Sequence, residues 1–168
     1  MVAVGDSLPS VTLKELVLID DTCTLGPRNV DVRAEAAGKT IALFAVPGAF
    51  TPTCSNSHLP GYIQLYNEFK AAGVDEIWCV SVNDAFVMGA WGKDQQAEGK
   101  VRMIADGDAE FTKALDLVLD LVGKGLGVRS QRYSLLVQDG VIKTINIEDN
   151  KTQNSFAPFL LDQAKSLQ

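Results

Sequence analysis

Three short apolar runs, each bounded by turn residues, limit what this chain can fold into. Runs of five or six mostly apolar residues are typical of buried strands, and here they occupy residues 41–46, 77–82 and 101–105. Between the first two, apolar residues spaced by three and four predict a helix over residues 53–72. After the second run, Asn83-Asp84 is expected to cap a helix that ends near Gly99. Strands that alternate with helices predict an α/β fold with parallel central strands.

The second half of the chain predicts a helix, a hairpin and a last helix. Residues 109–118 have a helical pattern, and Asp139-Gly140 between two strand-like runs is a strong hairpin signal. Ser155 is expected to cap the last helix, with Pro158 in its first turn. The hairpin would make the sheet antiparallel at one side.

Residues 1–38 predict mostly irregular structure. Short strands are expected at residues 11–13 and 16–19, and turn signals at Asp20-Asp21 and Gly26-Pro27 interrupt them. Taken together, the pattern predicts a single domain over residues 1–168. The economical match is a thioredoxin-like fold, with a central mixed sheet flanked by helices on both faces.

Charge and cysteine content narrow the classes of partner and compartment. The chain carries a formal net charge of −6, which disfavours nucleic acid or an anionic membrane as the main partner. No run of 18 apolar residues is present, so we expect no membrane-spanning helix. The first residues lack the pattern of a secretory signal or transit peptide, and three widely spaced cysteines suit a reducing compartment. We expect a cytoplasmic protein; a mature organellar form would have the same sequence features.

One cysteine lies where a thiol becomes reactive. Residues 47–55, with the sequence PGAFTPTCS, follow the first predicted strand and place Cys54 in the first turn of the next helix. Unpaired backbone N–H groups and the positive end of the helix dipole favour an anion there, so the thiolate is stabilised over the thiol. An arbitrary cysteine is more often inert core filler, but this position predicts a functional one.

The same stretch resembles a known family. Pro47, Thr51 and Cys54 match the Pro-x-x-x-Thr-x-x-Cys motif of the peroxiredoxins, and the match extends to residues 58–61, 81–88 and 125–133. These segments are similar to the atypical type II branch, which includes plant cytosolic and plastid enzymes and a vertebrate relative. The resemblance covers nearly the whole chain from about residue 40 onward. It implies thiol-dependent reduction of hydrogen peroxide and alkyl hydroperoxides, no metal, no organic cofactor and a homodimer.

The resemblance also implies roles for individual residues. Cys54 would attack the peroxide, Thr51 would hydrogen-bond the thiolate and the attacked oxygen, and Pro47 would shape and shield the pocket. Arg132 stands at the position of the family's active-site arginine, where it would neutralise the thiolate and orient the peroxide. Arg129 is expected to be a solvated loop charge or a support for the site.

The sequence says less about which thiol reduces oxidised Cys54 back to its thiol form. In vertebrate-like members a second cysteine near the start of the last helix does this, but this chain has Asn154-Ser155 there. Cys79 matches a cysteine of plant-type members, yet it is expected to be buried in a strand, and Cys23 lies in the poorly assigned first region. The hypothesis is therefore an external thiol, either glutaredoxin with glutathione or thioredoxin.

Several other readings of these residues stay open. His58, four residues after Cys54, would allow a cysteine hydrolase dyad or a metal pair, although local packing with an indirect role is the simpler interpretation. The glycines of residues 123–127 could suggest a phosphate cradle but fit a plain loop better.

A disulfide oxidoreductase would need a second thiol where Thr51 stands. A peroxide sensor or holdase chaperone would use the same cysteine. Three aromatic residues could form a dimer surface but are expected in the core: Phe50, Phe86 and Trp91.

Overall fold

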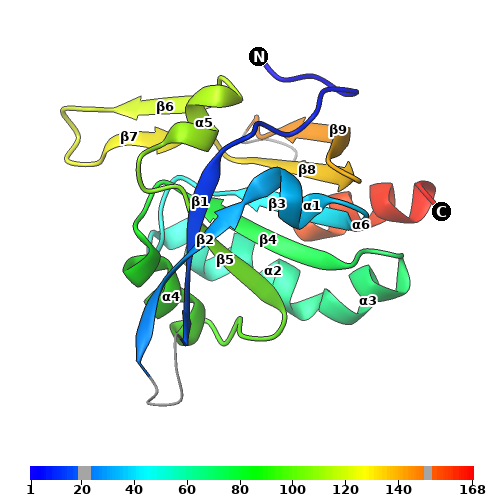
Figure 1. Ribbon diagram of the computed structural model, residues 1–168, viewed down its shortest axis with the longest axis horizontal. Helices are drawn as coiled ribbons and strands as arrows, with labels where there is room; N and C mark the ends of the chain where they lie inside the picture. Colours follow the sequence, from blue (N-terminus) through cyan, green and yellow to red (C-terminus); the bar gives the residue numbers. More distant parts are fainter. Residues whose placement is uncertain (19–23, 150–152) are drawn as a thin grey trace.

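The computed structural model describes residues 1–18, 24–149 and 153–168 (Figure 1). Its main sheet is made of β1 (Thr12–Leu18), β2 (Leu25–Asp31), β3 (Thr40–Ala45), β4 (Glu76–Ser81), β5 (Val101–Ala105), β8 (Tyr133–Gln138) and β9 (Val141–Ile147). The seven strands lie in the order β2-β1-β5-β4-β3-β8-β9. The three central strands β5, β4 and β3 are parallel, and both sides of the sheet are antiparallel. This confirms the predicted mixed sheet.

Helices cover both faces of the sheet, as the thioredoxin-like fold requires. One face packs against α2 (Leu59–Gln64), α3 (Tyr66–Ala71), α4 (Ala85–Asp94) and α6 (Ala157–Ser166). The other face packs against α1 (Val32–Ala36) and α5 (Glu110–Ala114). Side chains alternate along each strand, so Phe44 of β3 points into the first core and Leu43 into the second. Among the described residues, no helix is long and apolar enough to cross a membrane.

The first 38 residues are more regular than predicted. β1 and β2 pair over seven residues, and Pro27, predicted to lie in a turn, is opposite Leu16 in this ladder. A proline is tolerated there because β2 is the edge strand, where its missing N–H leaves no ladder position unpaired. The turn signal at Gly26-Pro27 was therefore wrong, and the predicted strand end at Ile19 and the turn at Asp20-Asp21 lie outside the described residues.

Three further boundaries differ from the prediction. The helix that was expected to end near Gly99 ends at Asp94. Val118 is not helical; it begins β6 (Val118–Leu121), which pairs with β7 (Gly127–Ser130) in a separate hairpin beside α5 (Figure 1). Ser155 does not cap α6, whose N-cap residue is Phe156, because the Ser155 hydroxyl donates to Glu148 instead. The cap of α4 is confirmed, since the Asp84 carboxylate accepts the N–H of Val87.

Candidate active site

The helix that carries Cys54 is wider at its start than an α-helix. Residues 54–58 form one π-helical turn, in which the N–H of Leu59 reaches the carbonyl of Cys54, five residues earlier. The next residue, Pro60, has no N–H to donate, which favours irregular hydrogen bonding at this point. The helix is interrupted at Leu65, between α2 and α3. The predicted continuous helix over 53–72 was thus wrong at Leu65, while the placement of Cys54 in the first turn of a helix is confirmed. Single π-helical turns are frequent at functional sites.

Strand register brings Arg132 to Cys54. β3 leads into the Cys54 loop, and its last residue, Ala45, pairs with Tyr133, the first residue of β8. Arg132 directly precedes that pair, and its Nη2 donates a hydrogen bond to Cys54 Sγ at 3.1 Å. The sulfur itself is completely buried, with 0% of Cys54 exposed. A cation therefore faces a buried thiol from a segment 78 residues away in the chain.

His58 completes this arrangement on the far side of the guanidinium. Arg132 Nη1 lies 2.7 Å from His58 Nδ1, and because arginine can only donate, Nδ1 must be the acceptor. The ring proton is then on Nε2, which donates to the carbonyl of Ser155 at 3.0 Å. The pKa of His58 is lowered to about 3, mainly by burial; the Ser155 hydrogen bond opposes this lowering, and the positive charge of Arg132 adds to it. Both ring nitrogens are engaged elsewhere, so His58 is not the base of a cysteine hydrolase dyad.

The lowered pKa of His58 predicts an acid-dependent loss of stability. The unfolded chain takes up a proton on this imidazole near pH 6.5, whereas the folded chain does so only near pH 3. Its contribution is thus fully present above about pH 6.5 and is lost as the pH falls. Between pH 7 and pH 4.5 we expect the unfolding free energy of the wild type to fall by about 2 kcal/mol more than that of His58→Gln. Urea titrations at the two pH values measure this; equal losses in both proteins would contradict it.

The loop before Cys54 is held by its own backbone and by Thr51. The Thr51 hydroxyl donates to the carbonyl of Gly48 at 2.7 Å, so its proton is used there and only its lone pairs remain for a ligand. The predicted hydrogen bond from Thr51 to the thiolate is therefore not the one that the hydroxyl makes. Phe50 adopts a left-handed backbone conformation with φ of 62°, which is strained for a bulky residue. Such strain persists only where the surroundings fix the loop.

Arg129 fixes this loop from the β6–β7 hairpin and does not contact the sulfur. Its Nη1 donates to the carbonyl of Pro47 at 3.2 Å, and its Nε donates to the carbonyl of Leu126 at 2.8 Å. A side chain on Gly48 would collide with this guanidinium, since a Cβ there would lie 2.7 Å from Nη1. The structure thus gathers six of the predicted residues around one small site: Pro47, Thr51, Cys54, His58, Arg129 and Arg132.

Two further side chains hold the residues around Cys54 through contacts that were not predicted from the sequence. Asn83, predicted to cap α4, accepts the N–H of Ala49 at 3.0 Å through its Oδ1. Trp91, predicted to lie in the core, is fully buried and donates from Nε1 to the Ser55 hydroxyl at 3.0 Å. Only the resemblance over residues 81–88 pointed towards the first of these. Helical spacing and cap preference carry no information on such long-range contacts.

Cys79 lies in the core behind the site. It is in the middle of β4, fully buried, and belongs to the same apolar cluster as Cys54. Burial raises the pKa of the Cys79 thiol, and the nearby Cys54 adds to this, so the thiol stays protonated near neutral pH. Both cysteines are free. Cys23 lies outside the described residues.

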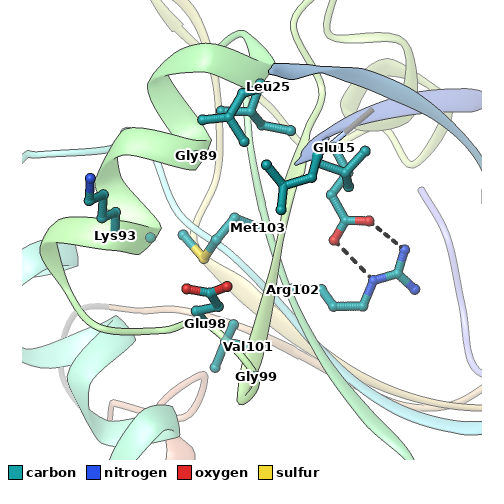
Figure 2. Close-up of a pocket in the computed structure, with 13 residues that line it drawn as sticks. Glu15, Leu25, Gly89, Lys93, Glu98, Gly99, Val101, Arg102 and Met103 are labelled. Atoms are coloured by element: carbon teal, nitrogen blue, oxygen red, sulfur yellow. Dashed lines mark hydrogen bonds and ion pairs between the residues drawn. The ribbon is translucent and has the colours of Figure 1, made fainter. Parts of the chain in front are cut away.

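A groove of the surface lies away from this site. The groove in Figure 2 has a volume of about 430 Å³ and lies between β1, α4 and β5, next to the ion pair of Glu15 with Arg102. None of the predicted site residues lines it. Among the described residues, no group of three or more His, Cys, Asp or Glu side chains is arranged to hold a metal ion. The buried sulfur with its cation is therefore the candidate active site.

Known proteins share this chain's sequence and fold. The profile of the Redoxin family matches residues 3–160. Peroxiredoxin-2E of Arabidopsis thaliana, a chloroplastic protein, is 49% identical over 150 residues, which are 88% of this chain and 62% of that longer protein. A Vibrio vulnificus protein, Prx3, solved in its reduced form in complex with hydrogen peroxide, is 50% identical with a TM-score of 0.89, over 98% of this chain and 99% of Prx3. A Burkholderia cenocepacia structure described as a thioredoxin reductase is 52% identical with a TM-score of 0.91, over 96% and 97%.

Proposed function

The chain belongs to the peroxiredoxin family, and on that premise we propose that it is a thiol-dependent peroxidase whose reactive group is Cys54. The substrates are hydrogen peroxide and alkyl hydroperoxides. The observation that carries this proposal is the hydrogen bond of 3.1 Å from Arg132 to the Cys54 sulfur inside a buried site. A fixed guanidinium beside a thiol favours the thiolate, which is the nucleophilic form.

The reaction follows from the donors and acceptors around the sulfur. The thiolate of Cys54 attacks one peroxide oxygen, the O–O bond breaks, and the proton of the attacked oxygen passes to the departing oxygen, which leaves as water or an alcohol. Arg132 stabilises the charge on the sulfur and on the oxygens, and a fixed donor of this kind contributes about 3 kcal/mol. The free lone pairs of Thr51 accept the peroxide O–H and orient the molecule. In this proposal, Pro47 shapes and shields the place where the peroxide binds.

The reaction needs no metal and no organic cofactor. The sulfur gives up two electrons and becomes a sulfenate, while the O–O bond takes the electrons up; the sulfenate then takes a proton from solvent to give the sulfenic acid. Neutral His58 adds no proton to this balance, because its one ring proton is held by the Ser155 carbonyl. The only further requirement is two external thiol groups: the first condenses with the sulfenic acid and releases water, and the second attacks the resulting mixed disulfide and frees the Cys54 thiol.

That reductant is glutaredoxin with glutathione, or thioredoxin, and Cys79 takes no part in resolving Cys54. Its thiol is buried in the middle of β4 and protonated, so it can neither attack quickly nor move without opening the sheet. We expect Cys79→Ser to retain activity within about twofold of the wild type with either reductant. Steady-state peroxide assays measure this, with Cys23→Ser as the matched variant. Activity that collapsed in Cys79→Ser, while Cys54 still reacted with peroxide, would assign resolution to Cys79.

Two other functions use the same cysteine. A thiol–disulfide oxidoreductase, the activity class in the description of the Burkholderia relative, would need a partner thiol near Cys54, and Thr51 stands at the position three residues before it. A peroxide sensor or holdase chaperone would form the sulfenic acid without sustained turnover. Continuous peroxide consumption with an external thiol favours the peroxidase, and a single oxidation event without turnover favours the sensor.

The active unit is a homodimer. Two phenylalanines that were expected in the core are exposed, Phe50 by 53% and Phe86 by 59%, so that prediction was wrong for both and right for Trp91 alone. Exposed aromatic side chains are typical of protein interfaces. We expect the wild type to sediment as a dimer at micromolar concentration and Phe86→Asp to sediment as a monomer. Sedimentation of both as monomers would contradict the homodimer.

The proposed location is the cytoplasm, because a reactive thiol needs a reducing compartment. Cell fractionation tests this. Recovery of the protein only from an organelle or from outside the cell would contradict it.

A further inference from the structure

Glu148 and Ser155 form a closed ring of hydrogen bonds with His58 and Arg132. The Glu148 Oε2 accepts the Ser155 hydroxyl at 2.7 Å and the Ser155 N–H at 3.2 Å. The Ser155 carbonyl accepts His58 Nε2, and His58 Nδ1 accepts Arg132 Nη1. The ring closes through the backbone, because the Glu148 N–H donates to the Arg132 carbonyl at 2.9 Å. Glu148 therefore holds Arg132 at two points. It binds the backbone carbonyl of Arg132 directly, and it holds the guanidinium indirectly, through Ser155 and His58.

The carbonyl of Ser155 is the point on which His58 depends. It is buried and also accepts the Tyr62 hydroxyl at 2.6 Å, so both of its lone pairs are used. If this carbonyl turned away, the His58 proton could move to Nδ1, and Nδ1 would then be a second donor facing the donor Arg132. The Arg132 guanidinium would then lose its acceptor, His58 Nδ1. Without this acceptor, its direction towards the Cys54 sulfur would no longer be fixed.

Stability does not account well for Glu148. Its second oxygen, Oε1, is buried without a hydrogen-bond partner among the described residues, which costs free energy. The Ser155 hydroxyl donates to this carboxylate, and α6 begins without a side-chain cap. Local arrangements that lower stability are expected mainly where function requires them.

We propose that Glu148 and Ser155 are positioning residues for the reaction at Cys54: they fix His58 as the acceptor for Arg132 and so aim the guanidinium at the sulfur. This inference rests on the proposed peroxidase function. Neither residue touches the sulfur, and each acts through His58.

The single histidine of the chain makes this testable, because its tautomer can be read from the two imidazole nitrogen shifts of histidine-labelled protein without assignment. In the wild type we expect only the Nε2–H form. In Glu148→Ala we expect a mixture of tautomers and a rate constant for reduced protein with hydrogen peroxide that is about tenfold lower. Glu148→Gln keeps an oxygen that can accept both Ser155 donors, so it is expected to restore most of the rate and the single tautomer. Exposed Glu68→Gln is the control and is expected to match the wild type.

Two results would overturn the proposal. One is a wild-type tautomer in Glu148→Ala, whatever the rate; the other is a Glu148→Gln as impaired as Glu148→Ala. If Glu148→Ala does not fold, Ser155→Ala replaces it, because this variant removes one of the two hydrogen bonds to Glu148. Mixed His58 tautomers with an about threefold lower rate constant would support the proposal. An unchanged tautomer and an unchanged rate constant would overturn it. If the wild type does not react with peroxide, the peroxidase function is refuted. The tautomer measurement would still show whether Glu148 and Ser155 fix His58 as the acceptor for Arg132.

Discussion

Replacing Cys54 with serine is expected to lower peroxidase activity by more than about 1000-fold, to the level of the solution without enzyme. An alcohol stays protonated near neutral pH, and its oxygen cannot be oxidised to the counterpart of a sulfenic acid. Steady-state peroxide consumption with an excess of external thiol measures the loss. The substitution is almost isosteric, and Arg132 Nη2 can donate to the new hydroxyl as it does to the sulfur. A urea titration of the variant checks that it is folded and that the loss does not reflect unfolding.

The control for this variant is Cys79→Ser, which removes the other described cysteine from the same core cluster. It should keep its activity. A Cys54→Ser protein that retained a tenth or more of the wild-type rate would show that another group reduces the peroxide, and it would remove the basis of the proposed function.

Replacing Arg132 with methionine is expected to cost about 100- to 1000-fold in the rate constant for the reaction with peroxide. Methionine keeps much of the apolar stem but removes the donor to Cys54 Sγ and the donor to His58 Nδ1 together. Arg132→Lys restores the charge but not the planar fork, because one ammonium cannot keep both hydrogen bonds in their present directions. We therefore expect lysine to recover only about tenfold of the loss. Stopped-flow measurement on the reduced protein gives these rate constants without interference from the reductant.

Arg129→Met is the matched control for this series. Arg129 comes from a neighbouring part of the chain, and its hydrogen bonds within the described residues go to the carbonyls of Pro47 and Leu126. Its loss should loosen the loop and reduce the rate by less than about tenfold. Equal losses in Arg129→Met and Arg132→Met would mean that the positive charge of the region matters, and not the directed hydrogen bond to the sulfur.

The sequence was enough to single out Cys54 as the candidate nucleophile and to predict the arrangement of the central strands. The apolar runs that became β3, β4 and β5 are mostly buried, and such runs can be recognised without tertiary information. Cys54 was found because its reactivity depends on a local feature, the start of a helix. Arg132 was found only through the family resemblance, because the pairing of Ala45 with Tyr133 that brings it to the sulfur cannot be read from spacing.

The errors share a physical cause, which is that tertiary contacts outweighed local preference. Pro27 was taken as a turn residue, yet an edge strand accepts it. Ser155 was taken as a cap, yet Glu148 offered its hydroxyl a stronger acceptor. The π-helical turn at residues 54–58 shifts the hydrogen bonds of the helix by one residue, and the apolar pattern of the segment does not reveal this shift. Thr51 was given the right place, but its proton is already used by Gly48.

The most direct test of the account is to find where the first oxidation occurs. Reduced protein is mixed with one equivalent of hydrogen peroxide in the presence of a sulfenic-acid trap, and the modified cysteine is identified by mass spectrometry. The account predicts a single adduct on Cys54, absent from Cys54→Ser and formed at least about 100-fold more slowly in Arg132→Met. An adduct on Cys79 or Cys23, or peroxide consumed with no adduct on Cys54, would contradict it.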